Sequence, residues 1–345
     1  EPTTALDVTT QVEVLASMRS IVEEFNTAAI YITHDLAVVA QMADTIKVLR
    51  HGHEVEEAPT RQMLSAPEQP YTKSLWSVRA LEKPQQAVQA SVLSLQGIDA
   101  SYGVQKVLHN VNIEVPKGST VAVVGESGSG KSLSSLAIMG LLSHELRITE
   151  GSMNFEGVDL LTLSDEEMRQ RRGRDVSMVF QEPMTSLNPV RNIGSQITES
   201  IEENLGLSKA AARSRAIDLL KEVGIADADR RMRQYPHHFS GGMRQRVMIA
   251  IALAAEPKLI VADEPTTALD VTIQAQVIDL MKDLVSEFGM GIIFITHDLG
   301  VIAQTADKVA VMYLGRLVEQ GSVRDVIRTP AHPYTRGLLA ALPTL

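Results

Sequence analysis

The chain has 345 residues, of which 44% are hydrophobic and none is cysteine. This composition is enough for the core of one large domain and part of another, and it excludes disulfides, thiolate metal sites and cysteine-ligated clusters. The formal net charge of −10 argues against a broad nucleic-acid-binding surface, which needs a basic face. No run of about 18 consecutive apolar residues is present, so the sequence predicts no membrane-spanning helix.

The chain contains an internal repeat. Glu1–Thr9 (EPTTALDVT) recurs as Glu264–Thr272, an offset of 263 residues. The segments His34-Asp35 and Pro70–Thr72 recur at the same offset. Residues 1–82 therefore duplicate the last 82, and the chain begins inside a repeating unit.

The first copy is predicted to be incomplete. In the second copy, a strand and further elements described below precede the matching residues, whereas the first copy starts at Glu1, without Met. We therefore expect an N-terminally truncated part of a longer tandem protein. Its pattern predicts a helix over residues 11–25 and strands over 28–33 and 45–49. Because parallel strands need covered faces and edges, we expect this copy to be marginally stable alone.

A polar, Gln-rich segment with one proline, residues 83–90, is predicted to be a linker. The complete second unit begins near Ser91. Apolar and polar residues alternate over 92–115, which predicts antiparallel strands around a turn at Gly103, with Tyr102 in that turn.

A phosphate-binding pattern follows the apolar strand Thr120–Val124. Gly125–Ser132 (GESGSGKS) matches G-x-x-x-x-G-K-[ST] and precedes a predicted helix over 132–142. Its glycines allow a tight turn that directs backbone N–H groups at phosphate oxygens, and the helix N-terminus adds a favourable dipole. Lys131 is then expected to reach the β- and γ-phosphates, and the Ser132 hydroxyl to bind Mg²⁺.

Three further elements are predicted before the next candidate residue. They are a strand over 151–158, a short helix over 164–171 with Ser164 as its N-cap, and a buried strand over 176–180. Gln181 follows that last strand directly, at the end where parallel sheets bind ligands.

An all-α insertion is predicted over about 190–256, with Ser208 as an N-cap and Gly224 as a C-cap. Within it, Phe239–Arg246 (FSGGMRQR) places two glycines at the start of a long apolar helix. The free N–H groups of such a helix start form an anion site.

Two more predicted strands end in chemically active side chains. The buried strand 259–262 ends in Asp263 and Glu264. An acid at a strand end beside a phosphate loop is suited to Mg²⁺, and the next carboxylate is suited to ordering a water. The strand 292–296 brings His297 to the same edge of the sheet.

Together these motifs resemble the full set of an ATP-binding cassette (ABC) ATPase, in the family's order. They are the phosphate loop, glutamine loop, signature, magnesium and catalytic acids, D-loop (Ala268–Asp270) and switch histidine. The resemblance covers about residues 91–345 completely, and 1–82 as the C-terminal part of a first cassette. It implies an α/β fold, with a P-loop NTPase (RecA-like) core, an antiparallel β subdomain and an inserted α-helical subdomain. The signature departs from the commonest LSGGQ at Phe239 and Met243.

Three segments are similar to the oligopeptide, dipeptide and nickel importer branch: FSGGMRQR, EPTTALDVT and His332–Thr335 (HPYT), in a C-terminal extension of about 322–345. Duplicated cassettes resemble the tandem peptide or glutathione importers of that branch. The resemblance implies an ATPase subunit peripheral to the cytoplasmic face of the inner or plasma membrane. Its implied partners are permease subunits, a second nucleotide-binding domain and, indirectly, a periplasmic or extracellular substrate-binding protein. No nucleic acid is implied.

The resemblance also implies ATP and Mg²⁺ as cofactors, and a role for each site residue. Tyr102 would stack on adenine, Glu264 would polarise the attacking water, and His297 would contact the γ-phosphate. The implied ATP-binding residues are Tyr102, Gly125, Glu126, Ser127, Gly128, Ser129, Gly130, Lys131, Ser132, Gln181 and Asp263. The implied catalytic residues are Glu264, His297 and Gln181, and the implied Mg²⁺ ligands are Ser132, Gln181 and Asp263. The residues implied to serve the opposing cassette's site are Ser240, Gly241, Gly242, Met243 and Asp270. The implied remnants of the first cassette are Glu1, Asp7 and His34.

Two other functions remain open at this point. The chain could be a soluble cassette ATPase that acts on DNA or ribosomes, or an interaction fragment that does not hydrolyse ATP. The transported substrate is also open between peptide, glutathione and nickel.

Overall fold

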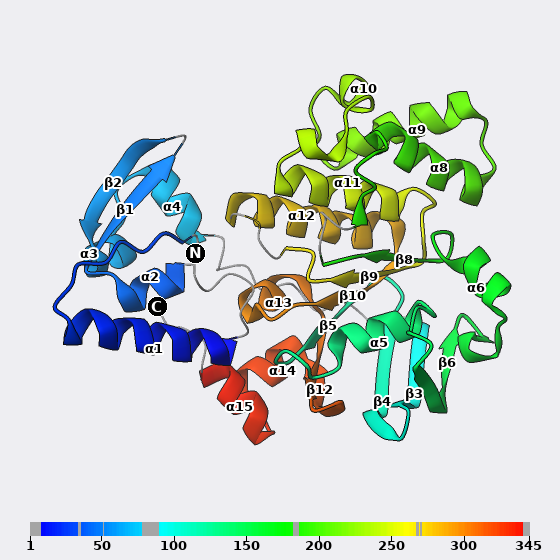
Figure 1. Cartoon of the computed structure of the whole chain (residues 1–345), viewed down its shortest axis with the longest axis horizontal. Helices are drawn as coiled ribbons and strands as arrows, with labels where there is room; N and C mark the ends of the chain where they lie inside the picture. Colours follow the sequence, from blue (N-terminus) through cyan, green and yellow to red (C-terminus); the bar gives the residue numbers. More distant parts are fainter. Residues whose placement is uncertain are drawn as a thin grey trace.

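The computed structural model describes residues 8–33, 36–50, 52–77, 90–181, 186–266, 269 and 271–340. The predicted linker, 83–90, lies outside these ranges apart from Ala90. Figure 1 shows the first copy in blue and the second unit in cyan to red.

A six-stranded sheet forms the centre of the second unit (Figure 1). Its strands, in spatial order, are β12 (Arg316–Ser322), β11 (Lys308–Tyr313), β5 (Thr120–Val124), β10 (Gly291–Ile295), β9 (Leu259–Asp263) and β8 (Val176–Val179). All neighbours are parallel except β11 and β12. Every residue of β5, β9 and β10 is buried, as expected for parallel strands covered on both faces. The predicted strands near 176–180, 259–262 and 292–296 are confirmed.

Helices cover one face of this sheet. Ile260 and Phe294 face a core that includes residues of α8, α9, α11 and α12. The helices that contribute to this core are α8 (Ile193–Leu205), α9 (Lys209–Glu222), α10 (Ala228–Arg231), α11 (Gly241–Leu253) and α12 (Val271–Phe288), with the 3₁₀ turn η2 (Pro236–His238) before α11. In Figure 1, α8, α9 and α10 lie beyond α11, away from the sheet. Ser208 caps α9 as predicted, and Gly224 follows its last turn with φ of 74°.

The other face packs against α5 (Lys131–Ile138) and a second, antiparallel sheet. Val261 and Ile293 share this core with Ile138 of α5 and Leu95 of the antiparallel sheet. The antiparallel strands, in spatial order, are β4 (Gln105–Pro116), β3 (Ser91–Tyr102), β6 (Leu146–Phe155) and β7 (Val158–Asp159). The predicted hairpin around Gly103 is confirmed.

Two predicted boundaries in this region are wrong. The helix expected over 132–142 ends at Ile138, because Gly140 leaves the helical conformation with φ of 60°. The single strand expected over 151–158 is the end of β6 and the start of β7, separated by a turn at Gly157. The 3₁₀ turn η1 (Leu160–Thr162) and α6 (Asp165–Arg171) follow, and Ser164 caps α6 in a capping box.

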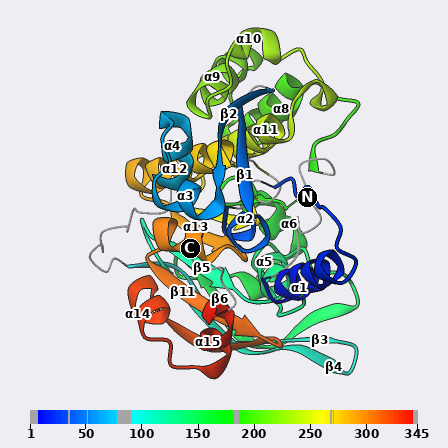
Figure 2. The ribbon, with the colours of Figure 1, turned by 90° about the vertical axis from the view of Figure 1, so that its left-hand side faces the viewer.

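The last described elements of the chain include helices that pack beside β5 and β11. Ala122 and Val311 share a small core with Ile302, Val326 and Leu338. These last three belong to α13 (Leu299–Thr305), α14 (Val323–Arg328) and α15 (Pro333–Ala340). The red helices α14 and α15 lie together in both views (Figures 1 and 2).

The first copy faces the viewer in Figure 2 and has its own small core of Ile46, Val48, Ala58 and Met63. Its elements are α1 (Val8–Glu24), α2 (Leu36–Met42), β1 (Thr45–Arg50), β2 (His53–Pro59), α3 (Thr60–Ser65) and α4 (Pro70–Ser77). The predicted helix near 11–25 and strand near 45–49 are confirmed.

The strand predicted over 28–33 is wrong. These residues form no strand, and Ile30 is 94% exposed. Its counterpart in the second copy, β10, lies between β5 and β9. The described part of the first copy holds no such neighbouring strands, and a central parallel strand has no hydrogen-bond partners without them.

Candidate active site

Four predicted site segments lie at one edge of the central sheet. The neighbouring strands β5, β10, β9 and β8 are parallel, so their C-terminal ends lie side by side. The phosphate loop follows β5, His297 follows β10, Asp263 and Glu264 end β9, and Gln181 follows β8. This is the edge where open α/β sheets bind ligands.

Lys131 holds the phosphate loop together. Its side chain is buried, and its Nζ donates to the carbonyl oxygens of Gly125 and Glu126, both at 2.8 Å, and to Ser129 Oγ at 3.4 Å. A buried ammonium at a helix N-terminus is an anion site, since the cation and the helix dipole both attract negative charge.

The β11–β12 hairpin constrains the loop from outside. A Cβ atom on Gly125 would lie 2.2 Å from the carbonyl oxygen of Met312, so only glycine fits there. Gly315, in the hairpin turn, donates its N–H to the carbonyl of Ser129 at 3.0 Å. A Cβ on Gly315 would lie 2.0 Å from the carbonyl oxygen of Val107. Glycine at 125 therefore lets the loop approach the hairpin, and glycine at 315 lets the hairpin turn approach β4.

Ser132 and Asp263 meet although 131 residues separate them. Ser132 Oγ donates to Asp263 Oδ1 at 3.2 Å. Burial raises the pKa of the Asp263 carboxyl, and the hydrogen bond from Ser132 opposes this shift. One buried carboxylate and one hydroxyl beside a phosphate site match the way Mg²⁺ is bound by few protein oxygens plus phosphates. The donor set therefore fits the expected metal.

Glu264 is held by two other predicted site residues. Gln181 Nε2 donates to Glu264 Oε2 at 2.9 Å, and His297 Nδ1 lies 3.4 Å from Glu264 Oε1. The hydrogen bond to Glu264 raises the pKa of His297, against the opposite effect of burial. Glu264 also has a positive φ of 47°. This backbone conformation is strained for a residue with a side chain, and such strain is often found at functional sites.

Tyr102 lies at the end of β3, in the hairpin turn, and its ring is half exposed. Its hydroxyl donates to the carboxylate of Glu145, and this hydrogen bond raises the pKa of Tyr102. The exposed ring is available for stacking.

The signature lies apart from the phosphate loop of the same chain. Ser240 caps α11 by accepting the N–H of Met243 at 3.4 Å. The helix α11 packs on one face of the central sheet, and α5 packs on the other. The structure therefore does not bring the signature and the phosphate loop together. The predicted residues Asp270, Glu1, Asp7 and His34 lie outside the described residues.

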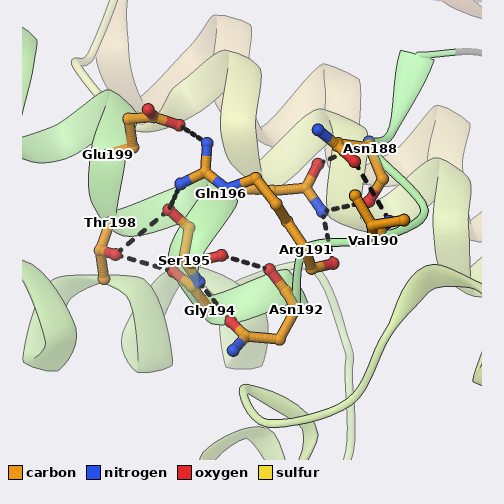
Figure 3. A network of polar contacts seen from close by, with 9 residues as sticks. All are labelled: Asn188, Val190, Arg191, Asn192, Gly194, Ser195, Gln196, Thr198 and Glu199. Atoms are coloured by element: carbon orange, nitrogen blue, oxygen red, sulfur yellow. Dashed lines mark hydrogen bonds and ion pairs between the residues drawn. The ribbon is translucent and has the colours of Figure 1, made fainter.

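Side chains fix the chain where it enters α8, after the glutamine loop (Figure 3). The Gln196 side chain accepts the N–H of Asn188 at 2.9 Å and donates to the carbonyls of Asn188 and Arg191 at 3.1 and 3.0 Å. Asn192 caps α8 through a first-turn N–H at 2.7 Å, and Arg191 pairs with Glu199. A displacement of this segment would therefore also displace α8.

One contact of the loop was not predicted from the sequence. The backbone N–H of Glu126 donates to the hydroxyl of Tyr334 at 3.0 Å. The only sequence signal for Tyr334 is that Pro-Tyr-Thr recurs in both copies, which indicates a shared packing role and not a contact with the loop.

Family models match this architecture. The ABC transporter model matches residues 108–267. The model for the C-terminal region of oligopeptide/dipeptide transporters matches twice, at 318–345 and at 55–99, a range that runs from β2 of the first copy into β3 of the second unit. Within the described ranges, no helix is both long and apolar enough to cross a membrane.

The chain belongs to the ABC transporter family of ATPases. It is 56% identical to the oligopeptide transport ATP-binding protein OppD of Bacillus subtilis over 244 residues, which cover 70% of this chain and 68% of OppD. It is 50% identical to the dipeptide transport ATP-binding protein DppD of the same organism, over 74% of this chain and 77% of DppD. Among solved structures it resembles a dimeric post-hydrolysis state of the cassette MJ0796 bound to ADP and Pi, with a TM-score of 0.61 and 29% identity, over 67% of this chain and 99% of that one.

Proposed function

We propose that this chain is the ATP-hydrolysing subunit of a peptide importer, which couples ATP hydrolysis to uptake through a membrane permease. Two comparisons support peptides as the cargo class. Relatives at 50–56% identity are named as oligopeptide, dipeptide or peptide import ATP-binding proteins, and the oligopeptide/dipeptide transporter region matches at 55–99 and at 318–345.

The observation that carries the proposal is the meeting of three groups at one sheet edge. They are the buried cation of Lys131, the Ser132–Asp263 oxygen pair, and Glu264 held between Gln181 and His297. Phosphoryl transfer needs positioned cations, donors and a water-ordering base more than a protein nucleophile. This set supplies those groups.

Lys131 would neutralise charge on the β- and γ-phosphates, and the backbone of the loop from Gly125 would cradle them. Ser132 and Asp263, with Gln181 nearby, would hold Mg²⁺, which neutralises phosphate charge when bound. Tyr102 would stack on the adenine.

Glu264 would orient the attacking water and polarise it by accepting its proton. Gln181 and His297 already fix the orientation of this carboxylate. The hydrogen bond to Glu264 raises the pKa of His297, which extends the pH range in which its protonated form could donate a hydrogen bond to the γ-phosphate.

The signature residues Ser240–Met243, together with Asp270, would complete the site of an opposing cassette. The separation of α11 from α5 on opposite sheet faces supports this assignment. In this chain, residues 91–345 would form the complete cassette, 83–90 the linker, and 1–82 the C-terminal part of another cassette. Two copies of the complete cassette would pair for activity.

The further partners are permease subunits and, through them, an external substrate-binding protein. We place the chain at the cytoplasmic face of the membrane as a peripheral subunit, without a nucleic-acid partner. Copurification with the permease, together with ATP hydrolysis that rises when peptide-loaded binding protein is added, would support this assignment. Nucleic-acid binding that weakens with salt would contradict it.

Glu264→Gln tests the catalytic assignment. The amide keeps the shape of the side chain but cannot accept a proton, so ATP binding should persist while Mg²⁺-dependent turnover falls at least about 100-fold. Glu287→Gln, on the exposed end of α12, is the control and should keep wild-type turnover. Wild-type turnover in Glu264→Gln would contradict the role of Glu264.

A further inference from the structure

The C-terminal helix contacts the phosphate loop through one side-chain oxygen. Glu126 is the second residue of the loop, and its N–H donates to the Tyr334 hydroxyl at 3.0 Å across 208 residues of sequence. The contact joins the region that matches the oligopeptide/dipeptide transporter model to the loop at the start of the cassette.

Packing and hydrogen bonds fix the position of Tyr334. Its ring packs on that of Tyr313, with centroids 4.3 Å apart. The Glu319 carboxylate accepts the N–H groups of Ala331 and His332 at 2.8 and 3.0 Å, directly before α15. His332 Nδ1 accepts the N–H of Tyr334 at 3.2 Å. The hydroxyl is therefore presented to the loop from a rigid support.

The β11–β12 hairpin contacts the loop at two other points. The carbonyl of Met312 lies against Gly125, and the N–H of Gly315 bonds to the carbonyl of Ser129. Both are backbone contacts. The contact of Tyr334 differs from them because deletion of one oxygen atom removes it and leaves the ring packing in place.

The first copy provides an internal comparison. Tyr71 occupies the position equivalent to Tyr334, in α4. Its ring lies under the guanidinium of Arg50, 4.7 Å away, where the second copy has Tyr313. Tyr71 therefore occupies the same local fold in the first copy, whereas the phosphate loop of residues 125–132 belongs to the second unit.

We propose that Tyr334 is a positioning residue for nucleotide binding, which acts through the N–H of Glu126 to hold the phosphate loop in its phosphate-accepting conformation. It does not touch the nucleotide. This inference rests on the proposed binding of ATP in this loop.

Tyr334→Phe in the full chain tests the inference. The loss of one hydrogen bond that orders the loop should raise the dissociation constants of both ATP and ADP about 2- to 10-fold, since both place phosphates in the loop. In the hydrolysis assay, KM should rise by a similar factor, while kcat should stay within about 2-fold of wild type, because the chemical groups are untouched. Calorimetric titration and steady-state kinetics measure these quantities.

Tyr71→Phe is the matched control and should leave both dissociation constants unchanged. The inference is overturned if Tyr334→Phe binds ATP and ADP with wild-type dissociation constants. If its melting temperature falls while both dissociation constants stay unchanged, Tyr334 has a structural role only, and the inference is also overturned. If the wild-type chain itself binds no ATP, the proposed function fails first, so the two failures are distinguishable.

Discussion

The two copies share a hairpin followed by two helices, and this part is built the same way in each. In β1–β2, Thr45 pairs with Pro59, and in β11–β12, Lys308 pairs with Ser322, with a register shift at the equivalent place. In the first copy Glu56 accepts two N–H groups before α4 at 2.8 and 3.0 Å, and Glu319 repeats both bonds before α15.

The copies differ where the fold depends on distant segments. Ile293 is 1% exposed in β10, whereas the equivalent Ile30 is 94% exposed in a segment without strand pairing. Hairpins and helices satisfy their hydrogen bonds within a short stretch, whereas a central parallel strand needs two neighbours supplied from elsewhere in the chain. The same sequence pattern therefore forms a strand only beside β5 and β9.

The largest expected difference between the copies concerns these two isoleucines. Ile293→Ala should destabilise the second unit by about 2–5 kcal/mol, because it leaves a cavity in a close-packed core. Ile30→Ala should change stability by less than about 0.5 kcal/mol, since the side chain is in solvent. Urea unfolding followed by circular dichroism measures both, and equal losses would contradict the comparison.

A second matched pair is the glycine in each hairpin turn. Gly52 and Gly315 both have positive φ, 79° and 73°, but a Cβ on Gly52 meets nothing within 4 Å. Gly52→Ala should cost about 1 kcal/mol from backbone strain alone. Gly315→Ala adds the clash with Val107, so we expect about 2–4 kcal/mol and weaker ATP binding. A similar cost at both positions would show that the hairpin turn does not press on Val107 of β4.

The smallest expected effect concerns pH. Burial alone would raise the pKa of Glu319, but hydrogen bonds, including those from Ala331 and His332, lower it below the ordinary value of 4.5. A lowered folded-state pKa contributes stability above the unfolded value, and this contribution is lost as pH falls through the folded value. Glu319→Gln should therefore be less stable than wild type at pH 7, and the gap should narrow below about pH 4.5.

Glu56→Gln is the matching variant, because it removes the equivalent carboxylate from the first copy. The hydrogen bond from the N–H of Glu68 lowers the pKa of Glu56. The stability difference between wild type and Glu56→Gln should therefore also narrow as the pH falls. A gap that is equally wide at pH 7 and pH 3.5 would contradict the anchoring role of these carboxylates.

Much of the site could be predicted because its residues lie at strand ends. The pattern around Lys131 and the acids after β9 are local in sequence, and parallel strands bring their ends together. The apolar pattern over 28–33 predicts a strand wrongly because the pattern is local, whereas a parallel strand depends on neighbours that the described part of the first copy does not hold. The contact of Tyr334 with Glu126 could not be predicted either, since it crosses 208 residues without a periodic signal. The marginal stability of the first copy stays a prediction.

The central claim is that Lys131, Asp263 and Glu264 serve a single ATP site in the second unit. Equilibrium binding of Mg-ATP to the full chain, compared between wild type and Lys131→Ala, tests it most directly. The account predicts that the wild-type chain binds one nucleotide. Lys131→Ala should bind it about 10- to 100-fold more weakly, because the charged hydrogen bonds from Lys131 to the phosphates are lost. Two nucleotides per chain, or unchanged affinity in Lys131→Ala, would contradict it.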